Sequence, residues 1–99
     1  MSAGDWKEFY AAACAGDEDT VRWALARGVD PNFQHAEYGT TALIGAVENG
    51  RLGIVRLLLA NGADPRLVAR WDQVDALAAA RSANRREILD ELMKAADES

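Results

Sequence analysis

Apolar residues in the middle of the chain recur at helical spacing in two consecutive segments. In the first segment, Leu43, Ala46 and Val47 would share one face of a helix. Gly50 then allows the chain to turn, and Gly62, after the second segment, can end a helix in the left-handed conformation. The apolar stripe of the second segment consists of Ile54, Val55, Leu58 and Leu59. The pattern predicts a pair of helices joined by a short turn.

The same pattern occurs before and after this pair at a spacing of 34 residues. Phe9 precedes Leu43 by 34 residues, and Pro31 precedes Pro65 by the same distance. In a weaker third copy, Leu77 takes the place of Leu43. Copies at one fixed spacing are typical of repeat proteins, whose units stack on one another. The predicted helices span residues 5–15, 18–26, 41–49, 52–61, 75–83 and 85–96.

The middle unit resembles an ankyrin repeat. The resemblance rests on Gly-Thr-Thr-Ala-Leu-Ile-Gly-Ala-Val-Glu-Asn-Gly at 39–50 and Ile-Val-Arg-Leu-Leu-Leu-Ala-Asn-Gly-Ala-Asp at 54–64. It implies an all-α solenoid of three helix-turn-helix units, with projecting β-hairpin fingers and a concave surface that grips other proteins. Ala42 and Ile44 stand where the family has Pro and His. Each finger also carries one residue more than the family's usual period of about 33 allows.

The three copies divide the chain into one domain, residues 1–99. Repeat 1 covers about 5–37 and repeat 3 about 72–96, and we expect both to act as caps around repeat 2 at about 38–71. Asn84 replaces the turn glycine in repeat 3. The outer face of that repeat is predicted to be polar because no further unit covers it.

The resemblance also implies where a partner would bind, at the finger tips and on the solvent side of each first helix. In repeat 2 these positions are Glu37, Tyr38, Thr40, Glu48 and Asn49. In repeat 3 they include Trp71, Asp72 and Val74, with Phe33 and Arg70 nearby.

Two of these positions, Tyr38 and Trp71, are the predicted anchors, because exposed aromatic residues often dominate protein interfaces. The alternative is that Tyr38, Trp71 and Phe33 fold back over their own finger or the neighbouring one. Trp23 aligns with Leu57 and is predicted to lie in the core or at its edge. Trp6 aligns with Thr40 and either is exposed or plugs the open end of the stack.

The composition excludes several classes of protein and site. The chain is 49% hydrophobic and 27% charged, as expected for a folded domain. One Cys and one His permit neither an internal disulfide nor a four-ligand zinc site, so we expect no metal or cofactor. Acidic neighbours argue against a reactive thiol at Cys14, and His35 is expected to be structural or exposed. The longest stretch without a charge, residues 38–47, is too short to cross a bilayer.

Charge is unevenly distributed along the chain. The net charge is −5, and the first 50 residues hold three bases against eight acids. Such a balance disfavours nucleic acid and favours a partner protein with a basic surface. The one basic cluster is interleaved with acids, as on a solvated face, and consists of Arg66, Arg70, Arg81, Arg85 and Arg86.

The sequence therefore predicts a non-catalytic module that binds a partner protein, as an adaptor, an inhibitor or an immunity-like or antitoxin-like regulator. We expect no enzyme because no nucleophile–base pair or phosphate-binding loop is present. The N-terminus lacks a signal peptide's apolar run, so a cytoplasmic location is expected. A monomer is favoured over a homo-oligomer. The alternative function is a structural unit that self-associates through its exposed repeat ends.

Overall fold

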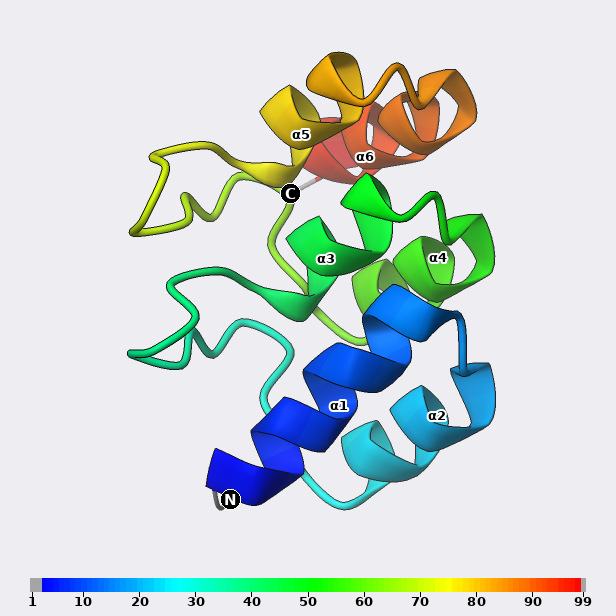
Figure 1. Ribbon diagram of the computed structural model, residues 1–99. Helices are drawn as coiled ribbons and strands as arrows, with labels where there is room; N and C mark the ends of the chain where they lie inside the picture. Colours follow the sequence, from blue (N-terminus) through cyan, green and yellow to red (C-terminus); the bar gives the residue numbers. More distant parts are fainter. Residues whose placement is uncertain (1–2, 99) are drawn as a thin grey trace.

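The computed structural model describes residues 3–98 and contains the predicted helix pairs (Figure 1). Each predicted helix is confirmed to within two residues at either end. The six helices are α1 (Ala3–Ala15), α2 (Glu18–Ala26), α3 (Ala42–Glu48), α4 (Leu52–Ala60), α5 (Ala76–Ser82) and α6 (Arg86–Glu98).

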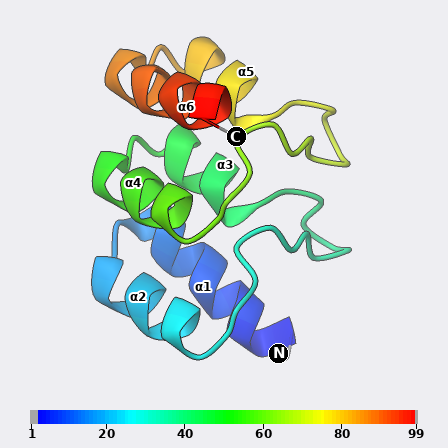
Figure 2. The same ribbon diagram turned by 180° about the vertical axis from the view of Figure 1, so that it is seen from behind.

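The helices form two layers. The first helices of the pairs, α1, α3 and α5, pack side by side, and so do the second helices, α2, α4 and α6 (Figures 1 and 2). Two loops, finger 1 (residues 27–41) and finger 2 (residues 61–75), project from the same side of the stack. The chain is thus an all-α repeat fold, as the sequence predicts.

Short polar side chains start three of the helices. The carboxylate of Asp17 accepts a hydrogen bond from the Thr20 amide at the start of α2, with an N–O distance of 3.2 Å. Thr41 does the same for α3 and Asp75 for α5. Each bond satisfies an amide that the helix itself leaves without an acceptor. The sequence thus fixes these boundaries locally.

The core runs continuously through all three pairs. Its largest members are fully buried and are Trp6, Phe9, Leu43, Ile44, Ile54, Leu58 and Leu92. Helix α3 lies in the middle of the stack, so every residue from Ala42 to Val47 is buried. A side chain at Gly45 would meet Tyr10 and Cys14 of α1, with the Cys14 sulfur 2.7 Å from the added Cβ. The small residue lets α1 and α3 approach closely.

Arginine side chains link successive pairs at the turns between helices. Nε of Arg51 donates to the Cys14 carbonyl at 2.9 Å, and Nη2 of Arg85 donates to the Glu48 carbonyl at 3.1 Å. Each guanidinium lies over the glycine of the preceding turn. A Cβ added to Gly50, for example, would lie only 3.0 Å from Cζ of Arg85. These cations meet the C-terminal end of α1 and of α3, where carbonyl dipoles favour positive charge. Arg85 is therefore an inter-repeat contact, beyond the solvated face that the sequence indicated.

The fingers are joined to each other mainly by two amide side chains. Gln34 donates to the Val68 carbonyl at 2.8 Å and accepts from the Arg70 amide at 3.1 Å. Asn32 donates to the Gly62 carbonyl at 2.9 Å and accepts from the Asp64 amide at 2.7 Å. Each amide thus pairs with both a donor and an acceptor of the next finger.

The β-hairpin form of the fingers is not confirmed, since no residue from 3 to 98 forms a strand. Two backbone bonds cross finger 2, from the Ala69 amide to the Val74 carbonyl at 2.8 Å and from the Gln73 amide to the Ala69 carbonyl at 3.0 Å. At its tip, Gln73 adopts a φ of 59° and its side chain donates to the Arg70 carbonyl. The loop therefore closes through turns and side-chain bonds.

The prediction for Trp23 is wrong, because its side chain is 51% exposed. The equivalent Leu57 is half-buried between neighbouring pairs, whereas no described helix pair covers this side of α2. The Arg27 guanidinium lies 4.6 Å from the centroid of the Trp23 ring. The ring is thus contacted by the cation that follows α2 directly.

Neither a membrane span nor a metal cluster emerges from the described part of the chain. None of its helices combines the length and the apolar character needed to cross a bilayer. Within the same residues, no three His, Cys, Asp or Glu side chains gather as metal ligands would.

Candidate protein-binding face

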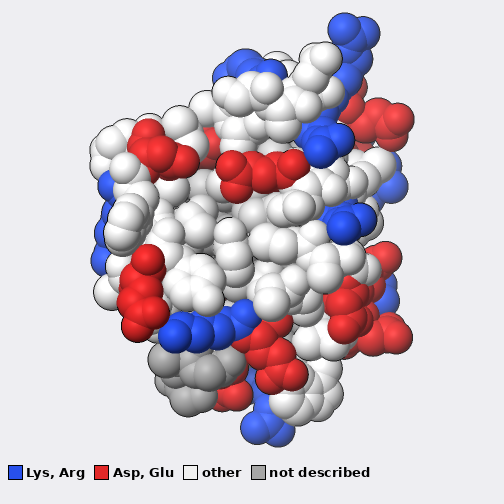
Figure 3. Space-filling view, viewed as in Figure 1, with Lys and Arg blue, Asp and Glu red and all other residues white. Residues whose placement is uncertain are grey.

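The predicted contact residues lie on fingers 1 and 2, at the start of α3 and at its C-terminal end. We call this surface the finger face and define it by five exposed residues: Glu37, Tyr38, Glu48, Trp71 and Asp72. Figure 3 views the molecule from the side of Figure 1, and uncharged atoms cover its middle while separate groups of acidic and basic atoms lie around them.

An aromatic cluster anchors finger 1 to α1. Trp6 is fully buried, and its Nε1 donates to the Phe33 carbonyl at 3.1 Å. The Trp6 ring stacks on Tyr10 with centroids 5.1 Å apart and on His35 with centroids 5.5 Å apart. Trp6 is therefore not exposed, and its contacts are with Tyr10 and finger 1, while the open groove at the α1–α2 end of the stack is lined by other residues. His35 is structural, as expected.

Tyr38 is held by this cluster while part of its ring stays accessible. Its edge-on contacts with Trp6 and Tyr10 have centroid distances of 5.1 and 5.3 Å. The side chain remains 39% exposed, and Lys7 Nζ lies 5.9 Å from its ring centroid. Tyr38 thus combines both readings of the sequence, because it packs over the finger and also presents a surface.

Trp71 is the most exposed large apolar side chain among the described residues, at 70%. One edge of its ring rests on Gly39 of finger 1, where an added Cβ would lie 1.1 Å from Cδ1 of the indole. Its amide also donates to the Gly39 carbonyl at 3.3 Å. The ring therefore bridges the two fingers and leaves most of its area to solvent.

Two carboxylates of the finger face, those of Glu48 and Asp72, lack a basic partner among the described residues. Burial raises the pKa of Glu48 above its usual value, and the negative charge of Asp72 raises that pKa further. Among the residues described, neither carboxylate has a Lys or Arg nitrogen within 4.0 Å. This part of the finger face thus favours a positive charge supplied from outside the chain.

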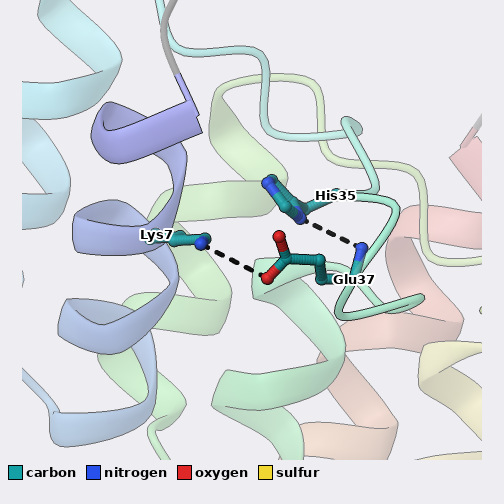
Figure 4. A network of polar contacts seen from close by, with 3 residues as sticks. All are labelled: Lys7, His35 and Glu37. Carbon is teal, nitrogen blue, oxygen red and sulfur yellow. Dashed lines mark hydrogen bonds and ion pairs between the residues drawn. The ribbon is translucent and has the colours of Figure 1, made fainter.

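Glu37 has a different environment at the tip of finger 1 (Figure 4). Its carboxylate pairs with Lys7 Nζ at 3.4 Å, and its amide donates to Nδ1 of His35 at 3.1 Å. Because both ion-pair partners are exposed, the pair contributes little to stability, on the order of 0–1 kcal/mol. Its main effect is to hold the tip of finger 1 against α1.

The remaining predicted residues have mostly local roles. The Asn49 amide group bonds to the Gly45 carbonyl at 2.8 Å, at the end of α3. Thr40 and Val74 are half-buried, Phe33 is 38% exposed beside the aromatic cluster, and the Arg70 amide bonds to Gln34. Tyr38, Trp71 and the carboxylates thus form the finger face, and the other predicted residues take part in local packing and hydrogen bonds.

Tyr10 was missed by the sequence reasoning. It is half-buried, and burial followed by the charge of Cys14 raises its pKa. Cys14 bonds to it, and burial is the largest of the effects that raise the thiol's pKa. A thiol with a raised pKa stays protonated, in line with the expectation that Cys14 is not reactive. The one available signal was that Tyr10 lies a helical turn after Trp6.

Comparison with known proteins gives a consistent picture. A family model described as "Ankyrin repeats (3 copies)" matches residues 9–99. The 2-5A-dependent ribonuclease of Homo sapiens is 49% identical over 51 residues, which are 52% of this chain and 7% of that protein. Protein HOS4 of Saccharomyces cerevisiae is 41% identical over 61 residues, 62% of this chain and 6% of that protein. The chain thus spans less than a tenth of the length of these relatives.

Proposed function

The chain belongs to the ankyrin-repeat family, and on that premise we propose that it is a non-catalytic module that captures a partner protein on its finger face. Ankyrin repeats in general mediate protein–protein interaction. The observation that carries the proposal is Trp71, which is 70% exposed while its ring edge is fixed on Gly39. A large aromatic side chain that is already held in place loses little conformational freedom on binding.

The chemistry around Trp71 supports a basic partner. Glu48 and Asp72 carry negative charge that no base in the described chain neutralises within 4.0 Å. An arginine or lysine from a partner would relieve their mutual repulsion and could lie on the indole ring, since cations are attracted to aromatic faces. Long-range attraction by the acidic chain would also speed the encounter.

The binding residues in this proposal are those predicted from the sequence, with Trp71 and Tyr38 as anchors. Glu37, Glu48 and Asp72 supply charge, and the others shape the surface: Phe33, Thr40, Asn49, Arg70 and Val74. The role is that of a cytoplasmic adaptor, inhibitor or immunity-like regulator, which acts by occupying its partner's surface. Neither nucleic acid nor a membrane is a proposed ligand.

Affinity purification from the native host tests the anchor directly. Trp71→Ala removes the exposed ring, and we expect the co-purifying partner to be lost, with affinity about thirtyfold weaker for a typical hot spot of about 2 kcal/mol. Trp23→Ala is the matched control, because Trp23 is also an exposed tryptophan but lies on α2, away from the fingers. Equal recovery of the partner with both variants would refute the finger-face assignment.

Charge is tested separately from the aromatic anchor. Glu48→Gln with Asp72→Asn keeps the shapes of both side chains, and we expect weaker capture that responds less to added salt. Glu87→Gln with Asp90→Asn removes the same charge from α6 and should leave capture unchanged. If the two double variants bind alike, the partner is not recognised through these carboxylates.

A further inference from the structure

The two ends of the helix stack each carry an open groove between the helices of a pair. At the bottom of Figure 1, a cavity of about 190 Å³ lies between α1 and α2 and is lined by Asp5, Glu8 and Trp23, among others. At the top, a cavity of about 220 Å³ lies between α5 and α6 and is lined by Arg81, Asn84 and others. We call these surfaces the α1–α2 face and the α5–α6 face.

Both faces point away from the rest of the stack. On α1, Tyr10 and Cys14 are directed at Gly45 of α3, while Asp5 and Glu8 line the cavity instead. On α6, Glu91 pairs with Arg56 of α4 at 3.2 Å. Arg86, at the start of the same helix, is exposed; it lines the α5–α6 cavity and also a cavity beside Gly50 and Leu52.

The charges of the two faces are complementary. The α1–α2 cavity is lined by Asp5 and Glu8, with Arg27 drawn over the Trp23 ring. The α5–α6 cavity is lined by three arginines, which are Arg81, Arg85 and Arg86. The sequence favoured a monomer and predicted a polar outer face for repeat 3. The structure adds that the polar groups of the two faces have largely opposite sign.

The repeat geometry indicates how two such faces would meet. Inside the stack, Arg51 and Arg85 reach back over Gly16 and Gly50 of the preceding pair. Asp17 occupies the equivalent position in the first pair, 34 residues before Arg51. A second copy continuing the stack beyond α5 and α6 would therefore place an aspartate, not an arginine, over the next turn.

That turn is suited to an aspartate. Asn84 stands there with a φ of 59°, in place of the glycine of the other turns. An arginine placed over this turn would be crowded by the Cβ of Asn84. At the equivalent turn one repeat earlier, a Cβ added to Gly50 would lie only 3.0 Å from Arg85. The short carboxylate of Asp17 needs less room. It already accepts two bonds from Thr20, and each oxygen can accept a further bond from the nearby guanidinium groups.

We propose that a second copy of this chain docks head to tail, with its α1–α2 face on the α5–α6 face of the first. Trp23, 51% exposed, and Met93, 45% exposed, supply apolar area on the respective faces. Such a contact uses two different patches, so it leaves one face free at each end and assembly continues along the stack axis. The finger faces of successive copies would then point to the same side.

Two double variants reverse the charge of one face each. Asp5→Lys with Glu8→Lys makes the α1–α2 face basic, and Arg81→Glu with Arg86→Glu makes the α5–α6 face acidic. Asp17 is left unchanged because it caps α2. Arg66→Glu with Lys94→Glu is the control, because it makes the same change of charge at residues that line cavities beside α4 and α6, outside both end cavities.

Sedimentation velocity over a range of concentrations measures the assembly. We expect the wild type and the control to gain mass with concentration at low salt and to lose it at high salt, because screening weakens the contact. Each face variant alone should remain a monomer, because its two faces now carry like charge. An equimolar mixture of the two face variants should associate again at a ratio of one to one, because every junction then joins opposite charges.

Three results would overturn the proposal. The first is a wild type that sediments as a monomer at every concentration and salt level. The second is assembly that survives in the face variants, and the third is a mixture that does not associate although both variants show a native circular dichroism melt. Trp71→Ala lies outside both faces and should assemble like the wild type, so this experiment is independent of partner capture.

Discussion

The arginine links between helix pairs can be tested at Gly50. Its φ of 70° lies in the left-handed region, and an added Cβ would lie 3.0 Å from both Cζ and Nη1 of Arg85. A Gly50→Ala variant must therefore adopt a strained backbone and also displace the guanidinium. The backbone costs about 1–2 kcal/mol, as for any L-residue in this region. Displacement loses the Arg85 bond to the Glu48 carbonyl, worth about 0.5–1.5 kcal/mol.

A double-mutant cycle separates these two contributions. Gly50→Ala should cost about 1.5–3.5 kcal/mol in the wild type, but only the backbone part of about 1–2 kcal/mol in an Arg85→Ala background. Urea unfolding followed by circular dichroism gives the four free energies, and a difference of 1 kcal/mol corresponds to about 4–8 °C in melting temperature for a domain of this size. Gly28→Ala is a useful comparison because its added Cβ has nothing within 4 Å.

The cycle can refute the reasoning. If Gly50→Ala costs the same with and without Arg85, the guanidinium does not constrain that turn and the link contributes nothing to stability. The same cycle can be repeated at Gly16 with Arg51, where an added Cβ would lie 3.2 Å from Nε. Agreement between the two turns would show that the link is a property of the repeat.

Three further predictions concern the core, the finger contact and pH. Leu58→Ala empties a fully buried site and should lower the free energy of unfolding by about 2–5 kcal/mol; an unchanged melting temperature would contradict the assigned stripe. Gly39→Ala would drive a Cβ into the Trp71 ring, so we expect a shifted tryptophan emission and weaker partner capture, whereas wild-type emission and capture would show that the ring does not rest there. The pKa of Glu48 is raised in the folded state, so the ionised carboxylate destabilises the fold at pH values above that pKa. This loss of stability disappears as the carboxyl is protonated, when the pH falls toward the ordinary value of 4.5. Glu48→Gln should therefore be more stable than the wild type at pH 7, and the gain should shrink at pH 4; an equal gain in the thermal melts at both pH values would contradict this.

Most of the fold follows from local signals in the sequence. Thr41 and Asp75 mark helix starts because their side chains bond to amides three residues on, and such bonds need no distant partner. The 34-residue period then places the pairs in order. The same period explains why the prediction for Trp23 is wrong. Aligning Trp23 with Leu57 assumes that each residue has a helix pair on either side, but Trp23 is 51% exposed.

Long-range contacts explain what the sequence did not predict. The bonds of Gln34 to finger 2 and of Arg51 to α1 join residues more than thirty positions apart, and neither residue type signals such a contact by itself. The exposure of Trp71 was predicted from its place in the finger. Its contact with Gly39 depends on how two irregular loops lie side by side, which no local pattern specifies.

The central claim is that a partner protein is held on the finger face at Trp71. The most direct test replaces Trp71 with a photoreactive phenylalanine analogue, irradiates the native host and identifies the crosslinked peptides by mass spectrometry, with the same analogue at Trp23 as the control. The account predicts a partner protein crosslinked through position 71, with basic residues near the crosslink, and none of it through position 23. Crosslinking of that protein through position 23 alone, or equally through both positions, would contradict the account.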